Sequence, residues 1–356
     1  MNTKHFLAAL TVCAIGTIHA QYSILDLPRE SQHGMVMQRI GTTDISVNYH
    51  RPSVKGRKIW GDLVPYGEVW RSGANENTTF ITKDDITIEG HKLAAGTYGL
   101  HTIPTATTWT VIFSNDHTAW GSFKYDQKKD ALRVTVTPRT GTMTEQVTYD
   151  IADVTSTGAT LLLRWEKLEV PIGIGVDVHA LVVAQLDDQL RGLSSFGWEA
   201  WYEAAHYCHA EKIAPEKAMK WVDMSVAIAP NFENQTLKAT MLEEQGKTAE
   251  AEVIRKQMID GATNAQLNTY AYSLMNQGKK AEAVKMFELN AKRHADDPNA
   301  YDSLGEGYMN NDQNADAIKS FKKSLSMSPP DGVRANSIKC LKKLGVDTSA
   351  WDKAKS

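Results

Sequence analysis

The sequence has little cysteine, no strong excess of either charge and no long apolar segment. Only 3 of its 356 residues are cysteine, and Cys208 and Cys340 are far apart in the chain. This pattern predicts buried thiols rather than a disulfide framework. The formal net charge of -3 at pH 7 argues against a general surface for nucleic acid or anionic membranes.

The sequence also lacks the short motifs that mark several enzyme classes. It contains no G-x-S-x-G nucleophile turn, no H-E-x-x-H zinc pair and no G-x-x-x-x-G-K-[ST] phosphate loop. The histidines at His50, His91, His101 and His117 show none of the short spacings that hold a metal ion. We therefore expect no metal and no cofactor, and we favour a binding protein over an enzyme.

Residues 1–20 have the pattern of a secretory signal peptide. A short positive start precedes an apolar run from Phe6 to Ile18, and Ala20 supplies a small residue at the cleavage point. The apolar run is too short to span a bilayer, and no later segment is long enough. We expect export to the periplasm or out of the cell, with cleavage near Ala20 and no transmembrane segment.

From about Thr43 to Val176 the apolar residues show the two-residue period of half-buried strands. Ile45, Val47 and Tyr49 alternate with polar residues. The segments TWTVIFSN, ALRVTVTP, EQVTYDIA and ATLLLRWE follow, at a spacing of roughly ten residues that is typical of short strands. Because no helical period intervenes, the pattern predicts an antiparallel β-sandwich.

After Val176 the apolar period changes to that of a helix, and the sequence repeats itself. QGKTAEAE at Gln245 recurs as QGKKAEAV at Gln277, and a recurrence of about 34 residues marks tetratricopeptide repeats. Small residues recur where paired helices approach each other, at Ala218, Ala251, Ala283 and Ala317. These positions define four repeats.

The predicted fold class is therefore an antiparallel β-sandwich followed by an all-α tetratricopeptide-repeat solenoid. The predicted organisation is a signal peptide (1–20), a β-sandwich domain (21–176), a linker (177–196), four tetratricopeptide-like repeats (197–331), a capping helix (332–346) and a tail (347–356).

Tyr49–Thr79 is the chemically densest stretch of the chain. It reads YHRPSVKGRKIWGDLVPYGEVWRSGANENTT, and its glycines and prolines predict a folded loop rather than a regular element. Its cations and aromatic rings either bind an anionic or polyhydroxyl ligand, or tie loop carbonyls together and close the end of the sandwich. The candidate ligand-binding residues are Arg51, Arg57, Trp60, Arg71, Asn75, Glu76 and His101.

This loop, with ITIEGHKLAAGTYGLHTIP, TWTVIFS, WGSFKYD and ALRVTVTP, resembles an exported bacterial domain family of unknown function. Members of that family occur alone or joined to tetratricopeptide repeats. The resemblance covers residues Ser31 to Pro171 and implies a compact sandwich in an exported protein. It implies no activity. Asn77 stands where the family pattern has a small residue.

The first helix of each tetratricopeptide repeat lines the concave face of the solenoid, so its outward positions predict a partner-binding groove. The groove residues are Glu203, Tyr207, Glu233, Glu243, Asn268, Tyr272, Asn276, Asn299, Asp302, Glu306 and Asn310. Their acids, amides and tyrosines favour an extended basic or polar protein segment as the partner. Packing of the repeats against the β domain, or self-association, is the alternative.

These patterns favour an exported cell-envelope binding or scaffold protein. Its repeats would bind a protein segment, and its sandwich a small ligand or glycan. The alternative is a hydrolase or glycan-processing enzyme that uses Arg71, Glu76 and His101, because a carboxylate and an imidazole facing one cleft can transfer protons. Sugar binding by Trp60, Trp70 or Trp120 is a third hypothesis.

Overall fold

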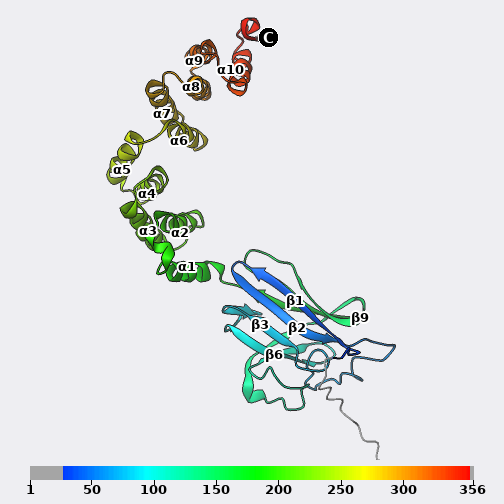
Figure 1. Cartoon of the computed structure of the whole chain (residues 1–356). Helices are drawn as coiled ribbons and strands as arrows, with labels where there is room; N and C mark the ends of the chain where they lie inside the picture. Colours follow the sequence, from blue (N-terminus) through cyan, green and yellow to red (C-terminus); the bar gives the residue numbers. More distant parts are fainter. Residues whose placement is uncertain (1–26, 353–356) are drawn as a thin grey trace, which may run out of the picture. The chain divides into compact units, whose positions relative to one another are not determined.

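The structure is a computed structural model that describes residues 27–352, and the predicted signal peptide lies outside the described residues. The chain divides into two compact units, with the boundary between Val182 and Val183. We call them the β unit and the repeat unit (Figure 1). Within residues 27–352, no helix has the length and apolar character needed to cross a membrane.

The β unit contains two antiparallel sheets. The six-stranded sheet has the order β1-β2-β3-β6-β7-β8, built from β1 (Gln32–Ile40), β2 (Thr43–Arg51), β3 (Thr79–Thr82), β6 (Gly96–Pro104), β7 (Trp109–Ser114) and β8 (Asp130–Val136). The four-stranded sheet has the order β5-β4-β10-β9, built from β4 (Ile86–Ile88), β5 (His91–Leu93), β9 (Arg139–Ala152) and β10 (Gly158–Gly175). A short 3-10 helix, η1 (Gln127–Lys129), precedes β8.

Alternation of buried and partly exposed residues fixes the register of the strands. In β2 the side chains of Ile45, Val47 and Tyr49 are buried, while the residues between them are partly exposed. A one-residue shift in pairing would turn all three away from the core. This confirms the antiparallel strands expected in the N-terminal part of the chain.

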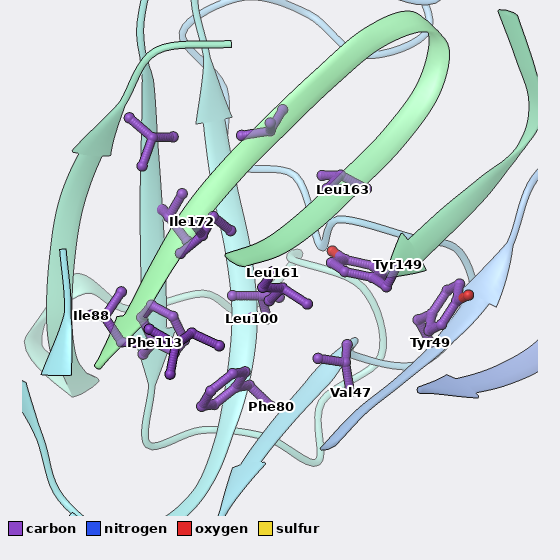
Figure 2. Close-up of a cluster of buried hydrophobic side chains, with 14 of the residues drawn as sticks. Val47, Tyr49, Phe80, Ile88, Leu100, Phe113, Tyr149, Leu161, Leu163 and Ile172 are labelled. Carbon is purple, nitrogen blue, oxygen red and sulfur yellow. The ribbon is translucent and has the colours of Figure 1, made fainter. Parts of the chain in front are cut away.

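Both sheets contribute to one hydrophobic core. Figure 2 shows Val47, Phe80 and Leu100 from the six-stranded sheet gathered with Leu161 and Ile172 from β10. All five are at most 1% exposed. This core anchors both ends of the segment 52–78, which joins β2 to β3 and which we call the signature loop.

The repeat unit is built from helices that follow one another in sequence order (Figure 1). The helices are α1 (Val178–Gln189), which begins in the β unit, α2 (Trp198–Ala210), α3 (Pro215–Ile228), α4 (Phe232–Glu244), α5 (Thr248–Asp260), α6 (Asn264–Asn276), α7 (Lys280–Arg293), α8 (Pro298–Asn310), α9 (Asn314–Ser326), α10 (Asp331–Lys343) and α11 (Ser349–Asp352). The segment expected as a linker, 177–196, contains α1 and the 3-10 helix η2 (Leu193–Phe196).

The recurring QGK sequence has a conformational cause. Gly246 and Gly278 each follow the first helix of a pair, and both have a φ of +77°. Residues with a Cβ rarely adopt this left-handed conformation, whereas glycine adopts it without strain. The repeated glycine therefore ends α4 and α6 in the same way and turns the chain into α5 and α7.

Large and small residues interlock between the helices of the repeat unit. Phe287 and Phe321 are fully buried, and each lies against a glycine of α8. A Cβ added at Gly305 would come within 2.7 Å of Phe321, and one added at Gly307 within 2.5 Å of Phe287. The close approach of these helices therefore requires residues without side chains at both positions.

Candidate functional site

Backbone hydrogen bonds to β6 and side-chain hydrogen bonds hold the second half of the signature loop. Trp70 and Thr102 exchange two backbone hydrogen bonds of 2.8 Å. Ser72 has a φ of 56°, which is costly for a residue with a Cβ. Its carbonyl accepts hydrogen bonds from the Thr78 hydroxyl at 3.2 Å and from the Tyr149 hydroxyl at 3.0 Å. These contacts stabilise the unusual conformation immediately after Arg71.

Four tryptophans form a packed cluster, in which Trp60 and Trp70 of the signature loop meet Trp109 of β7 and Trp165 of β10. The Trp60 ring lies 4.9 Å from Trp109, 5.7 Å from Trp165 and 5.8 Å from Trp70, each in an edge-to-face arrangement. Trp70 stacks on Trp165 at 5.6 Å. The Trp60 ring, expected as a stacking surface for a ligand, is thus in contact with three other tryptophans.

A cavity of about 290 Å³ lies beside this cluster, and we call it the loop cavity. It is lined by Glu30, Ser31, Pro52, Ser53, Lys55, Arg57, Leu63, Val64, Trp70, Arg71, Gly73, Ala74 and Trp165. Of the predicted ligand residues, Arg57 and Arg71 line it. The volume is close to the lower end of the range for small-molecule sites, roughly 300 Å³.

Positive charge predominates around the loop cavity. Lys55 forms an ion pair with Glu30, the one carboxylate in the lining. Arg57 donates hydrogen bonds to the carbonyls of Val54 and Ser53, which hold its guanidinium in place. For Arg71, burial lowers the pKa of the guanidinium, and its Nε has no hydrogen-bond partner within the part of the chain described.

Three other predicted ligand residues have partners elsewhere. Arg51 donates to the Val147 carbonyl at 3.0 Å and to the Thr148 hydroxyl at 2.8 Å, and so joins β2 to β9. Asn75, at a φ of 58°, donates to the Ser31 carbonyl. Glu76 pairs with Arg29 at 2.6 Å. These contacts match the hypothesis that polar groups of the loop tie the chain together.

His101 lies in β6, and its side chain is 3% exposed. Its Nδ1 is 2.9 Å from the Ser122 hydroxyl, and its Nε2 is 3.4 Å from Nδ2 of Asn77. Burial lowers the pKa of His101 to about 4, although the charges of Asp130 and Asp116 oppose the shift. The imidazole is therefore neutral at pH 7.

The carboxylate and imidazole of the enzyme hypothesis are not in direct contact. Glu76 lies 3.4 Å from Nδ1 of His50, whereas the contacts of His101 are with Ser122, Asn77 and Tyr125. The pKa of His50 is lowered, chiefly by burial. Glu76 and His101 line no part of the loop cavity. The loop cavity therefore does not bring Glu76 and His101 together.

The repeat unit has a second hollow, about 350 Å³ in volume, across the first helices of three successive pairs. We call it the first-helix pocket. It is lined by Tyr202, Phe232, Glu233, Thr236, Ala265, Gln266, Thr269, Tyr270 and Ser273. Phe232 and Tyr270 meet edge to face at 6.0 Å. Glu233 is the predicted groove residue in this lining, and it is exposed.

Residues 31–174 match the model of a family described as a protein of unknown function (DUF2911). A search of curated proteins gives no match.

The helices resemble those of three solved proteins. YrrB, a TPR protein with an unusual peptide-binding site, is 16% identical over 46% of this chain and 83% of its own, with a TM-score of 0.29. PilW, a widely conserved type IV pilus biogenesis factor, is 19% identical over 49% and 82%, with a TM-score of 0.31. MamA from Desulfovibrio magneticus RS-1 is 14% identical over 41% and 84%, with a TM-score of 0.27.

Toward the C-terminal end, several predicted groove residues bond to one another and to α10. Glu306 accepts hydrogen bonds from Tyr272 at 2.6 Å and from Asn336 at 2.7 Å. Asp302, which is 5% exposed, accepts from Asn336 at 2.8 Å and from Ser337. Burial raises the pKa of Asp302. These side chains join α6, α8 and α10 to one another.

The remaining groove residues differ in exposure and in hydrogen bonding. Glu243 pairs with Arg255 and Lys279. Burial is the largest single influence and raises the pKa of Glu243, but the hydrogen bonds and charges of Arg255 and Lys279 together outweigh it, so the pKa is lowered. Asn310 donates to the Glu306 carbonyl, and the Asn299 backbone donates to Asp297. Glu203 and Asn276 are exposed, while Tyr207 and Asn268 are partly buried.

Sequence reasoning missed the cavity residues that come from outside the signature loop. Trp165 lies in β10, and Glu30 and Ser31 precede β1. No local pattern links them to Arg71, because only the folded sheets bring them together. Lys55 lies inside the loop, but its residue type does not separate its role from that of its neighbours. In the DUF2911 region the sequence therefore predicts some of the residues that line the cavity, but not all of them.

Proposed function

We propose that this chain is an exported binding protein of the cell envelope. Its repeat unit holds a segment of another protein, and its β unit, with the two sheets packed as a sandwich, holds a small ligand. The pattern of residues 1–20 supports export. Intact-mass analysis of the protein from envelope fractions tests it, since export predicts a chain that begins near Gln21 and retention predicts an uncleaved one.

One observation carries the protein-binding part of this proposal. The first-helix pocket joins α2, α4 and α6, and it combines the aromatic rings of Tyr202, Phe232 and Tyr270 with the carboxylate of Glu233. Aromatic rings supply large contact area at low conformational cost, and they predominate at binding hot spots. A basic residue beside an apolar or aromatic one is the chemistry that fits this pocket.

Charge reversal at Glu233 tests this proposal in the full-length protein. We expect Glu233→Lys to weaken binding of a labelled lysine- and tyrosine-containing peptide by about tenfold, or about 1.4 kcal/mol. Fluorescence anisotropy measures the affinity. A peptide with glutamate in place of lysine should bind the wild-type protein no more tightly than the lysine peptide binds the Glu233→Lys variant.

Glu250→Lys is the matched control. Glu233 and Glu250 are both exposed, and each lies in the first turn of its helix, α4 and α5 respectively. Both substitutions therefore disturb the helix dipole alike, but only Glu233 lines the pocket. Equal losses of peptide affinity in the two variants would contradict a partner site on the first helices.

A further inference from the structure

Among the described residues Arg71 has no acidic partner, unlike Arg133 and Arg164, two other partly buried arginines of the β unit. Arg51 also has none there, but it donates hydrogen bonds to the Val147 carbonyl and the Thr148 hydroxyl. Arg164 pairs with Asp150 at 2.8 Å and with Glu169 at 3.1 Å. Arg133 pairs with Asp130 at 2.8 Å. Within residues 27–352, no carboxylate forms an ion pair with Arg71, and burial alone lowers the pKa of its guanidinium.

This arrangement is unfavourable for the unliganded protein. Burying a guanidinium costs free energy because the charged group loses its hydrating water. A carboxylate partner offsets part of this cost, and Arg71 has no such partner in the part of the chain described. The buried Nε of Arg71 is also without an acceptor. Its histidine neighbours cannot neutralise it, because an imidazole is either neutral or positive. The pKa values of His50 and His101 are lowered by burial and, to a smaller extent, by the positive charge of Arg71.

The loop cavity places Arg71 among groups that suit a particular kind of ligand. Arg71, Arg57 and Lys55 line it, against the single carboxylate of Glu30. Arginine presents its donors as a planar fork that matches a carboxylate. The lining also includes apolar surface, contributed in part by Trp70 and Trp165. The lining thus combines excess positive charge with aromatic surface.

We propose that the loop cavity binds a small carboxylate with an aromatic or short aliphatic body. The carboxylate of the ligand pairs with Arg71, and its apolar body lies on the tryptophan side. This rests on the proposed binding of a small ligand by the β unit, and it is independent of peptide binding by the repeats. The cavity volume of about 290 Å³ limits the ligand to roughly the size of a single substituted ring.

The test uses the full-length protein with benzoate as the probe. Benzamide has the same shape without the charge, and inorganic phosphate has the charge without the apolar body. We expect benzoate to bind wild-type protein by calorimetry and to raise its Tm. Benzamide and phosphate should each bind at least tenfold more weakly.

Arg71→Met is the decisive variant, and Arg164→Met is its control. Arg71→Met should lose benzoate binding at least tenfold while its ligand-free Tm stays equal to or rises above that of wild type. Arg164→Met removes an arginine that has two acidic partners, so it should lower the Tm and leave benzoate affinity within twofold. Arg71→Lys keeps the charge without the fork and should bind with intermediate affinity.

Several outcomes would overturn the inference, and they are distinguishable from one another. A fall in Tm for Arg71→Met with unchanged benzoate binding would assign Arg71 a structural role. Equal binding of benzamide and benzoate would show a ligand site in the β unit that does not require a negative charge on the ligand. Tighter binding of phosphate than of benzoate would show that the site binds an anion without requiring an apolar body. Binding of none of the three probes would reject a small carboxylate as the ligand of the loop cavity, whereas the Glu233 experiment would be unaffected.

Discussion

The two units use their polar side chains differently, although the sequence predicts binding through them in both. In the repeat unit, Asp302 and Glu306 have hydrogen-bond partners on α10. In the β unit, Arg71 lines a cavity with no acidic partner within the described chain. The first arrangement holds helices together, whereas the second leaves a charge that the proposed ligand would neutralise.

This difference shows that residue type and position in the sequence are insufficient to identify a binding residue. Asp302 and Arg71 both lie where sequence patterns predict a binding surface. What separates them is whether another part of the same chain satisfies their hydrogen bonds and charge. The comparison can be tested by removing a packed ring, a buried titratable group and an internally bonded acid.

The largest effect is expected from Trp60→Ala. Trp60 contacts three other tryptophans, so its removal leaves a large void in the β unit. We expect a loss of about 4 kcal/mol in the free energy of unfolding, measured by urea denaturation. Hydrogen exchange followed by mass spectrometry should show the loss in β7 and β10, which contain Trp109 and Trp165, and leave α6 to α9 unchanged.

The alternative role of Trp60 gives a different result. If its ring were a stacking surface for a ligand, Trp60→Ala would keep wild-type stability and lose ligand affinity. Leu63→Ala is a suitable control, because Leu63 lines the loop cavity but its side chain is 44% exposed. It should cost well under 1 kcal/mol, since a largely exposed side chain buries little area on folding.

Much of the fold follows from the sequence because its signals are local. The two-residue alternation of Ile45, Val47 and Tyr49 defines one face of a strand, and the repeated QGK sequence reports a turn that needs positive φ at Gly246 and Gly278. Each signal depends on neighbouring residues alone. The antiparallel strands and the helical repeats can therefore be predicted from the order of the residues.

The candidate site is only partly predictable, because its geometry depends on distant contacts. The density of cations and aromatic rings points to Arg57 and Arg71, which do line the cavity. The same density predicts Arg51 and Trp60 as ligand-binding residues just as strongly as Arg57 and Arg71. Only the contacts of Arg51 with β9 and of Trp60 with Trp109 and Trp165 separate the two groups.

The next largest effect is expected from the titration of His101. Because His101 lies in the β unit, its protonation should destabilise that unit as the pH is lowered. The ordinary histidine pKa is 6.5, and burial lowers it to about 4 in the folded protein. Between these values the unfolded chain binds a proton that the folded chain does not. Stability is therefore fully present above pH 6.5, falls as the pH is lowered, and loses about 3 kcal/mol by pH 4.

His101→Gln tests this, because glutamine keeps polar groups in the site but does not titrate. The decrease in unfolding free energy between pH 7 and pH 4 should be about 3 kcal/mol smaller in the variant than in the wild type. Hydrogen exchange at β6 and β7 localises the difference to the β unit. Parallel pH profiles for the two proteins would show that His101 is not the group responsible.

The smallest effect is expected from Asp302→Ala in the repeat unit. The change removes the acceptor of the Ser337 hydroxyl and one of the two acceptors of the Asn336 amide, which keeps Glu306, so we expect a loss of about 2 kcal/mol. The exposed Asp296 is the matched control, and Asp296→Ala should change stability by less than about 0.5 kcal/mol. If Asp302 instead contacted a partner, its replacement would weaken peptide binding and leave unfolding unchanged. Loss of hydrogen-exchange protection in α10, with peptide affinity retained, would place Asp302 among the residues that hold the repeats together.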